Sequence, residues 1–180
     1  GVRECKVAEL GRVPWVQHRD TRLELLNRGG RYAVRARTRT SRAREAFCGV
    51  PTFDYDPDWV VTARYAALAR PRLVEVATYR PDLRQRIPVV GEVVGTVRDR
   101  PLRLAVTSIR HGLGVEFHDP TNGAETPDWR QLKIPEPDRH GRVVLDFNRT
   151  ANMWFAFTDF ATCPAPVPEN IIGVPVRAGE

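Results

Sequence analysis

At 180 residues, with 42% hydrophobic and 28% charged residues, the chain has the size and composition of a globular domain that can bury its own core. No apolar run approaches the roughly 20 residues that cross a bilayer, so we expect no membrane association. The net charge of +6 would favour nucleic-acid binding, but only Lys6 and Lys133 among the 28 basic residues are lysine. Because this bias is typical of a GC-rich genome, we expect no nucleic-acid partner.

The first predicted element is a helix over residues 14–27. Trp15, Leu23 and Leu26 lie near one helical stripe, and Arg28-Gly29-Gly30 behind them is typical of a helix end. We therefore expect residues 1–30 to form an N-terminal helical segment, the one helix of the chain.

From Arg31 the hydrophobic period changes to two, which is typical of a strand. Tyr32 and Val34 share one face with other uncharged residues, and Arg35 and Arg37 share the opposite face. The arginine face has two interpretations: a strip that binds anions, or a face that contacts water. The second is favoured, because charge runs usually face solvent.

Further short segments rich in Val, Thr and aromatic residues predict strands. They cover residues 59–65, 73–79, 89–97, 102–109, 114–118, 143–147, 153–157 and 171–176. Turns are expected at Asp99-Arg100, Arg110-His111-Gly112, residues 119–123 and His140-Gly141. This pattern predicts a mainly β chain. We expect a single-domain antiparallel β-barrel, with a β-sandwich as the alternative, over residues 31–160, followed by a Pro-rich strap and final strand over residues 161–180.

Cysteine and histidine usage indicates neither a disulfide framework nor a metal site. Cys5, Cys48 and Cys163 cannot all pair within one chain and match no metal-binding spacing, so we expect reduced thiols in the cytoplasm. No Walker, dinucleotide or nucleophile-elbow motif occurs, and we expect no cofactor.

The C-terminal third carries a series of motifs in a fixed order. They are Phe117-His118-Asp119, Gly123, Glu125-Thr126, Val144 to Arg149, Phe157, Ala161-Thr162-Cys163-Pro164, Pro166, Pro168-Glu169-Asn170 and Arg177-Ala178-Gly179-Glu180. With Phe47-Cys48-Gly49-Val50, Phe53 and Asp56-Pro57-Asp58-Trp59 upstream, they make the chain resemble the family named domain of unknown function 1684. The family has no settled activity, so the resemblance implies no reaction.

Two departures from that family concern candidate functional positions. Asp128-Trp129-Arg130-Gln131-Leu132 keeps an arginine but lacks the glycines that the family has there. Phe155 stands where the family has a cysteine, so thiol chemistry assigned to that position cannot operate in this chain.

Polar candidates gather between residues 130 and 152. On a strand, Asp146 and Asn148 share one face, and if they point into a barrel they need partners, for which Arg130 is the natural candidate. Arg149 and Asn152 lie close by in the sequence. The alternative for Asp146, Asn148 and Arg149, equally favoured, is that they tie the tail down through bonds to its backbone. For Glu169, Asn170, Cys163 and the prolines, the structural role is favoured.

Aromatic residues and one histidine complete the candidate site. Trp129, Trp154 and Phe157 would shape an apolar pocket, although each single ring is more often a packing residue. His118 beside Asp119 is a candidate general base, with polar surface as the alternative.

The leading hypothesis is a cofactor-independent enzyme with an apolar pocket. Asp146, Arg130 and His118 are the predicted catalytic residues; Trp129, Asn148, Asn152, Trp154 and Phe157 are the predicted substrate-binding residues. The expected substrate is a small apolar organic molecule that could carry a carboxylate, and the expected reaction is an isomerisation, cyclisation or elimination of secondary metabolism. The alternatives are a ligand-binding module without chemistry and a structural or partner-binding domain.

Overall fold

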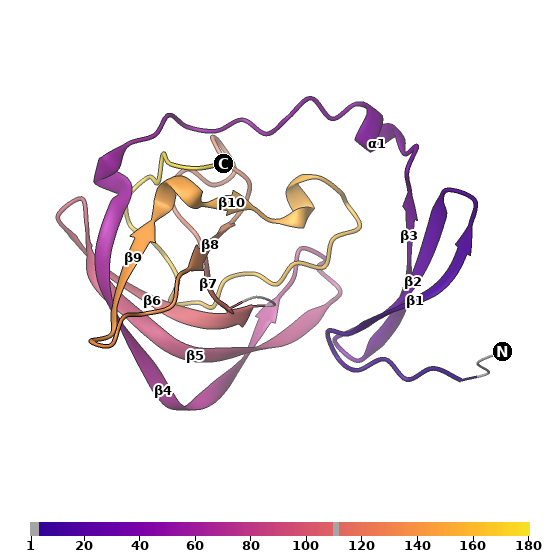
Figure 1. The fold of residues 1–180 in the computed structure, drawn as a ribbon, viewed down its shortest axis with the longest axis horizontal. Coiled ribbons are helices and arrows are strands. Elements are labelled where there is room, and N and C mark those ends of the chain that lie inside the picture. Colours follow the sequence, from indigo (N-terminus) through magenta and orange to yellow (C-terminus); the bar gives the residue numbers. More distant parts are fainter. Residues whose placement is uncertain (1–3, 110–111) are drawn as a thin grey trace.

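The computed structural model describes residues 4–109 and 112–180, which form two antiparallel sheets (Figure 1). The first has the order β1-β2-β3, with β1 Arg12–His18, β2 Thr21–Arg28 and β3 Arg31–Thr38. The second has the order β10-β8-β7-β6-β5-β4-β9. Its strands are β4 Val60–Ala77, β5 Arg84–Val97, β6 Arg100–Ile109, β7 Gly112–Phe117, β8 Arg130–Ile134, β9 Arg142–Asp146 and β10 Ala151–Asn152. The mainly β, antiparallel character predicted from the sequence is confirmed.

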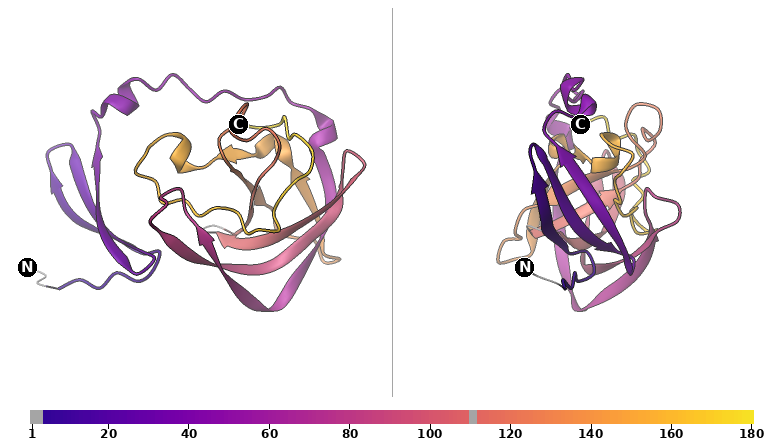
Figure 2. Two further views of the ribbon diagram at one scale, coloured as in Figure 1. Left: turned by 180° about the vertical axis from the view of Figure 1, so that it is seen from behind. Right: turned by 90° about the vertical axis from the view of Figure 1, so that its right-hand side faces the viewer.

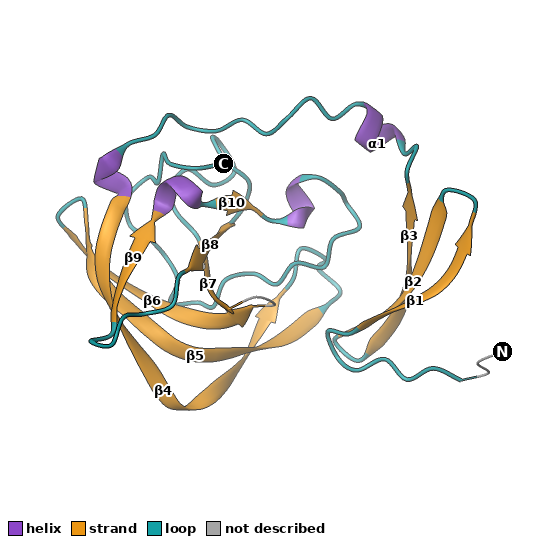
Figure 3. Ribbon diagram, viewed as in Figure 1, coloured by secondary structure: helices purple, strands orange, loops and turns teal. Residues whose placement is uncertain are grey.

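Helical structure is confined to short segments (Figure 3). These are α1 Arg42–Glu45 and the 3-10 turns η1 Pro57–Trp59, η2 Phe147–Arg149 and η3 Trp154–Ala156. Among the helices of the described residues, none has the length and apolarity needed to cross a membrane.

The predicted N-terminal helix is wrong, because the segment forms β1 and β2. Leu23 and Leu26 lie on opposite faces of β2, where they pair with Ala36 and Ala33 of β3. Gly29 and Gly30, taken from the sequence as a helix end, instead have φ of +58° and +72° and connect β2 to β3 as a hairpin turn.

The strand predictions for the larger sheet are confirmed for its long members, but not for the tail. The predicted strands 59–65 and 73–79 are halves of β4, which pairs with β5 on both sides of an irregularity between Ala67 and Arg72. Residues 153–157 are not a strand, because η3 turns the chain there. Residues 171–176 contribute only an isolated bridge between Ile171 and His118. The turn predicted at Arg110-His111 lies outside the described residues.

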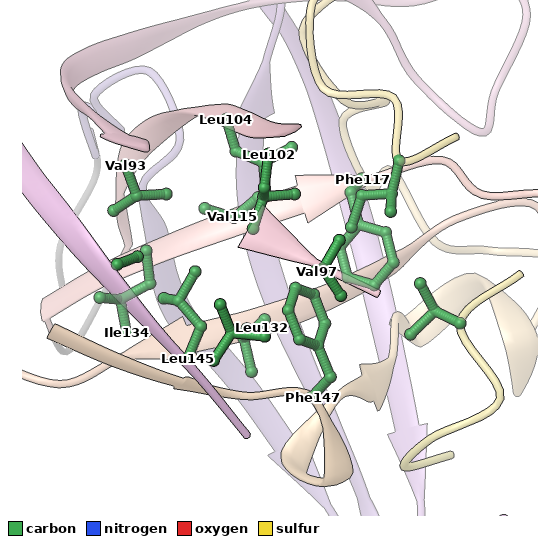
Figure 4. Packing of buried hydrophobic residues seen from close by; sticks show 14 of the residues in the cluster. Val93, Val97, Leu102, Leu104, Val115, Phe117, Leu132, Ile134, Leu145 and Phe147 are labelled. Carbon is green, nitrogen blue, oxygen red and sulfur yellow. The ribbon is translucent and has the colours of Figure 1, made fainter. Parts of the chain in front are cut away.

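The main core lies on the concave side of the seven-stranded sheet, which curls around it (Figures 1 and 4). Leu104, Val93 and Phe147 are fully buried there. In Figure 4, Val97 and Leu132 lie beside Phe117 and Phe147, whose rings meet edge to face at 5.9 Å. The interior of the sheet is therefore filled by its own side chains together with Ile172, Val176 and Ala178 of the C-terminal strap.

The C-terminal strap crosses this core and is held by one buried amide. Asn170 is fully buried; its Oδ1 accepts from the backbone N–H of Ala105, and its Nδ2 donates to the carbonyls of Ala105 and Glu116. Every hydrogen bond of the Asn170 side chain therefore goes to a backbone group, which is what a structural role for this residue requires.

Candidate functional site

Arg130 fastens the C-terminal end of the chain to the sheet. Its side chain is fully buried, and Nη2 donates to Asp119 Oδ2 at 2.9 Å and to the carbonyl of Val176 at 2.7 Å. Nη1 donates to the carbonyls of Ala178 and Glu180 at 3.0 and 2.8 Å. Four of the five guanidinium donors belong to these two nitrogens, so the bonds satisfy most of what Arg130 could offer a ligand.

The expected partner of Arg130 was Asp146, and this expectation is wrong. Phe117 of β7 pairs directly with Arg130 of β8, which brings the following turn and Asp119 over the guanidinium. Asp119 Oδ1 also accepts from Thr121 and from the backbone N–H of Val176. Asp146 ends β9, which pairs with β4 elsewhere in the sheet.

Asp146 and Asn148 form a clamp on the segment that joins the two sheets. Asp146 Oδ1 accepts from the backbone N–H and the side-chain Nδ2 of Asn148, and so caps η2. Asn148 in turn donates to the carbonyl of Asp56 and accepts from its N–H, both at 3.0 Å. The weak ion pair from Arg149 to Asp146, at 3.9 Å, is on an exposed arginine. These contacts are structural, but they hold the backbone of Asp56 and not the C-terminal tail, so the expected bonds from these three residues to the tail are not found among them.

Trp129 belongs to a second aromatic cluster behind β8. Its ring lies 4.3 Å from Phe155 and 6.4 Å from Tyr79, measured between centroids, and Cys163 completes the packing. Burial raises the pKa of the Cys163 thiol, so the thiol stays protonated at neutral pH. His118 contacts the edge of this cluster: its ring lies 6.0 Å from Trp129, and Nδ1 is 2.9 Å from the carbonyl of Asp128.

A groove of about 460 Å³ separates the segment after β3 from the end of the larger sheet. One wall comes from residues 43–51 and the other from the turn before β8, from β10, from η3 and from the last residue of the chain. The lining residues are Ala43, Ala46, Phe47, Cys48, Gly49, Val50, Pro51, Glu125, Thr126, Pro127, Asn152, Ala156, Phe157 and Glu180. Phe47 on one wall and Phe157 on the other meet edge to face, with ring centroids 6.1 Å apart.

The polar groups at this groove are mainly acceptors. Asn152 Oδ1 is buried and has no partner among the described residues, although its backbone N–H donates to Glu180 Oε2 at 2.8 Å. Glu125 accepts twice from Arg177, at 2.7 and 2.9 Å, and this hydrogen bond lowers the pKa of Glu125, which is therefore charged at neutral pH. The groove is thus lined by a mixture of apolar side chains and the polar side chains of Glu125, Thr126, Asn152 and Glu180.

The structure brings only part of the predicted site together. Asn152 and Phe157 line the groove, whereas Trp154 is 73% exposed outside it. Asp146, Arg130 and His118 have separate partners, and none of the three lines this groove. Within residues 4–109 and 112–180, no group of three His, Cys, Asp or Glu side chains is placed to hold a metal ion.

Sequence reasoning missed several residues of the groove. Phe47, Cys48, Glu125, Thr126 and Glu180 all lie in motifs that carry the family resemblance, yet none received a functional role. The available signal was that these residues recur in a family motif although three of them, Phe47, Cys48 and Glu125, are exposed. An exposed residue in such a motif is not needed for packing, which favours a role in binding.

Comparisons with known proteins give a family and a fold. Residues 45–180 match the model of a family described as Protein of unknown function (DUF1684). The chain is also similar to the solution NMR structure of an uncharacterized protein of Haloarcula marismortui, at 29% identity and a TM-score of 0.61. That match covers 76% of this chain and 78% of the archaeal chain. No curated protein matches the chain.

Proposed function

We propose that this chain, which belongs to the DUF1684 family over residues 45–180, binds a small, largely apolar organic molecule. The ligand would lie in the groove between residues 43–51 and β10. The observation that carries the proposal is the groove itself. Its volume of about 460 Å³ lies within the range of roughly 300–1,000 Å³ that is typical of small-molecule sites. Like those sites, it combines apolar side chains, among them Phe47, Val50 and Phe157, with polar ones.

The polar groups favour a ligand that donates hydrogen bonds. Asn152 Oδ1 is a buried acceptor without a partner, and a ligand donor would satisfy it once the Asn152 side chain turns toward the groove. The carboxylate of Glu180 lies on the same wall and favours a positive charge, whereas that of Glu125 is already paired with Arg177. We therefore infer an apolar amine or alcohol. A carboxylate is disfavoured, because Arg130 directs both of its terminal nitrogens at Asp119 and at backbone carbonyls.

Catalysis in the same groove is a second candidate. One observation favours it: the Cys48 thiol and the carboxylates of Glu125 and Glu180 line the space where a ligand would lie. A cofactor-independent isomerisation, cyclisation or elimination would then depend chiefly on holding the ligand in a reactive shape. Binding alone remains the better-supported function, since the predicted acid and base residues lie elsewhere.

Two wider interpretations accompany this proposal. We interpret the curled seven-stranded sheet as a barrel left open between β9 and β10, its two edges, because it surrounds a packed core on one side. The free thiols of Cys5, Cys48 and Cys163 support a reducing, cytoplasmic compartment.

The test is an NMR titration with matched amines and acids. We expect 2-phenylethylamine and related arylalkylamines to shift the amide signals of Asn152, Phe157 and Thr126, and 3-phenylpropanoate to shift them much less. Asn152→Leu removes the free acceptor, and Phe157→Ala removes one apolar wall; each should weaken amine binding about tenfold, the effect of one lost hydrogen bond or ring contact.

Trp154→Ala is the matched control, because Trp154 is an exposed neighbour of Phe157 that does not line the groove. It should leave the affinity unchanged. The proposed function is refuted if no amine of the panel shifts these signals, or if Trp154→Ala weakens binding as much as Phe157→Ala.

A further inference from the structure

The three-stranded sheet has one apolar and one charged face. Residues directly opposite in an antiparallel pair share a face, so the register of β1, β2 and β3 assigns each side chain. The apolar face carries Val13, Val16, His18, Thr21, Leu23, Leu25, Asn27, Tyr32, Val34, Ala36 and Thr38. None of these residues is Asp, Glu, Lys or Arg. The charged face carries Glu24 with Arg12, Arg22, Arg31, Arg35 and Arg37.

The charged face is the one turned toward the rest of the molecule. Glu24 and Leu26, both on this face, are the buried residues of β2. Arg31 pairs with Asp82, which follows β4, at 2.8 Å. Glu24 is held at 3.1 Å by Arg37 and at 3.8 Å by Arg12, so the buried carboxylate is paired. The inner face is thus stabilised by ion pairs.

The apolar face points outward and has no cover among the described residues over much of its area. Tyr32 is 62% and Val34 is 52% exposed, and Val16 is 45% exposed. Trp15, the additional residue at the irregularity of β1, is 62% exposed. In the right-hand view of Figure 2, the three strands stand side by side in front of the larger sheet. A sheet with one apolar face normally buries that face against a second layer.

We propose that the second layer is the same face of a second copy of this chain. Two such sheets packed face to face would form a two-layered core of the kind found in β-sandwiches, with a two-fold axis between them. Burial of Tyr32, the six aliphatic side chains of this face and the neighbouring Trp15 would remove roughly 500 Å² from each copy, hence about 1,000 Å² in total, which reaches the lower limit of specific interfaces.

The charge distribution favours a second copy over other partners. Each copy has a net charge of +6, so two copies repel each other except where a surface lacks charge. This face lacks charge, as the centre of a protein interface usually does. A nucleic acid would need the arginines, and those of β3 lie on the inner face, where Arg31 pairs with Asp82 and Arg37 with Glu24.

The first experiment is sedimentation of the wild-type chain from low micromolar to millimolar concentration at several salt concentrations. We expect a monomer–dimer equilibrium that strengthens with salt, because salt screens the repulsion between like-charged copies. A chain that stays monomeric over the whole range overturns the proposal. An association that weakens with salt also overturns it, since arginine contacts would then hold the assembly together.

Val34→Arg and Ala33→Arg give a matched pair on adjacent residues of β3. Val34 lies on the apolar face and Ala33 on the charged face, and both are exposed. Val34→Arg should weaken self-association at least about tenfold, while Ala33→Arg leaves it unchanged. Equal weakening by the two variants, or no weakening by Val34→Arg, contradicts the assigned face.

A mixing experiment separates loss of contact from loss of the sheet. Val34→Glu and Val34→Lys should each be monomeric, because each places like charges opposite one another in a symmetric pair. Mixed in equal amounts, they should form a heterodimer with opposite charges across the interface. Failure of the mixture to associate, with the β2–β3 amides of each variant still protected from hydrogen exchange, contradicts the proposal.

Discussion

The two sheets of this chain differ in how far they bury their apolar faces. The seven-stranded sheet curls around its apolar residues, and Leu104, Val93 and Phe117 are fully buried within it. The three-stranded sheet leaves Trp15 and Tyr32 more than half exposed. The larger sheet therefore buries its apolar face within the chain. The smaller sheet leaves much of its apolar face exposed, and burying it would take another layer.

The two sheets also differ in how they bury charge. In the larger one, the Arg130–Asp119 pair is fully buried. It makes hydrogen bonds with backbone groups of Val176, Ala178 and Glu180 in the C-terminal strap. In the smaller one, the carboxylate of Glu24 is buried but its arginine partners remain about half exposed. Removing a partner should consequently cost far more in the larger sheet.

Arg130→Met is expected to have the largest effect. It removes the partner of a buried carboxylate and leaves the carbonyls of Val176, Ala178 and Glu180 without their donor. The free energy of unfolding, measured by urea denaturation, should fall by about 3–5 kcal/mol. The smaller sheet makes none of these contacts. The free energy of local opening of the β2–β3 amides, measured by hydrogen exchange, should therefore stay unchanged.

Arg103→Met is the control for this variant. Arg103 also pairs with a carboxylate, that of Glu92 at 2.6 Å, but its side chain is 69% exposed. The same substitution there should cost less than about 1 kcal/mol. If the two variants lose equal stability, the buried network does not hold the strap.

The sequence predicted the larger sheet better than the smaller one, for a physical reason. The Val- and Thr-rich pattern over residues 89–97 and 102–109 predicts strands and nothing else, because both segments are long and bounded by turn residues. In β1 and β2, Leu23 and Leu26 are three residues apart, a spacing that also fits a helix. The alternation of Leu23 and Leu25 was the correct signal, and it was outweighed by Gly29-Gly30, which can end a helix or turn a hairpin.

The candidate site was only partly predictable, because its walls are distant in the sequence. Asn152 and Phe157 could be selected as polar and aromatic residues in an unusual motif. Their opposite wall, Phe47 and Cys48, lies about 100 residues earlier, and only the fold shows that the two meet. The partner of Arg130 depended on the register between β7 and β8, which residue types alone do not reveal.

Glu24→Gln tests the charge arrangement of the smaller sheet. Burial by itself raises the pKa of Glu24, but the hydrogen bond from Arg37 and the charges of Arg37, Arg12 and Arg35 outweigh it, so the pKa is lowered from its ordinary value of 4.5. A carboxylate with a lowered pKa stabilises the folded state above its unfolded pKa, and this contribution is lost as the pH falls through the folded value. The variant should lose about 1–2 kcal/mol at neutral pH.

The measurement is hydrogen exchange of the β2–β3 amides as a function of pH. In the wild type, protection should decline as the pH falls below the ordinary pKa of Glu24; in Glu24→Gln it should already be low at neutral pH and change little with acid. The Leu104 amide, in the larger sheet, serves as the internal reference. A wild-type profile that stays flat through this pH range would show that Glu24 does not stabilise the sheet.

Asn148→Ala should have the smallest effect, and it acts where the two regions are joined. The substitution removes the two hydrogen bonds to the backbone of Asp56, and with them the clamp on the segment that leads to the groove wall at residues 43–51. We expect a loss of about 1 kcal/mol in the free energy of unfolding, together with faster hydrogen exchange at the Asp56 amide.

Asp146→Asn is the control for this clamp, because its amide oxygen can still accept from the backbone N–H of Asn148 and keep the cap of η2. It should cost less than half as much and leave the Asp56 amide protected. The reverse order of effects would show that the charge of Asp146, and not the bridge from Asn148, holds the joining segment. Since the groove has one wall on that segment, weaker amine binding by Asn148→Ala but not by Asp146→Asn would link the clamp to the proposed ligand site.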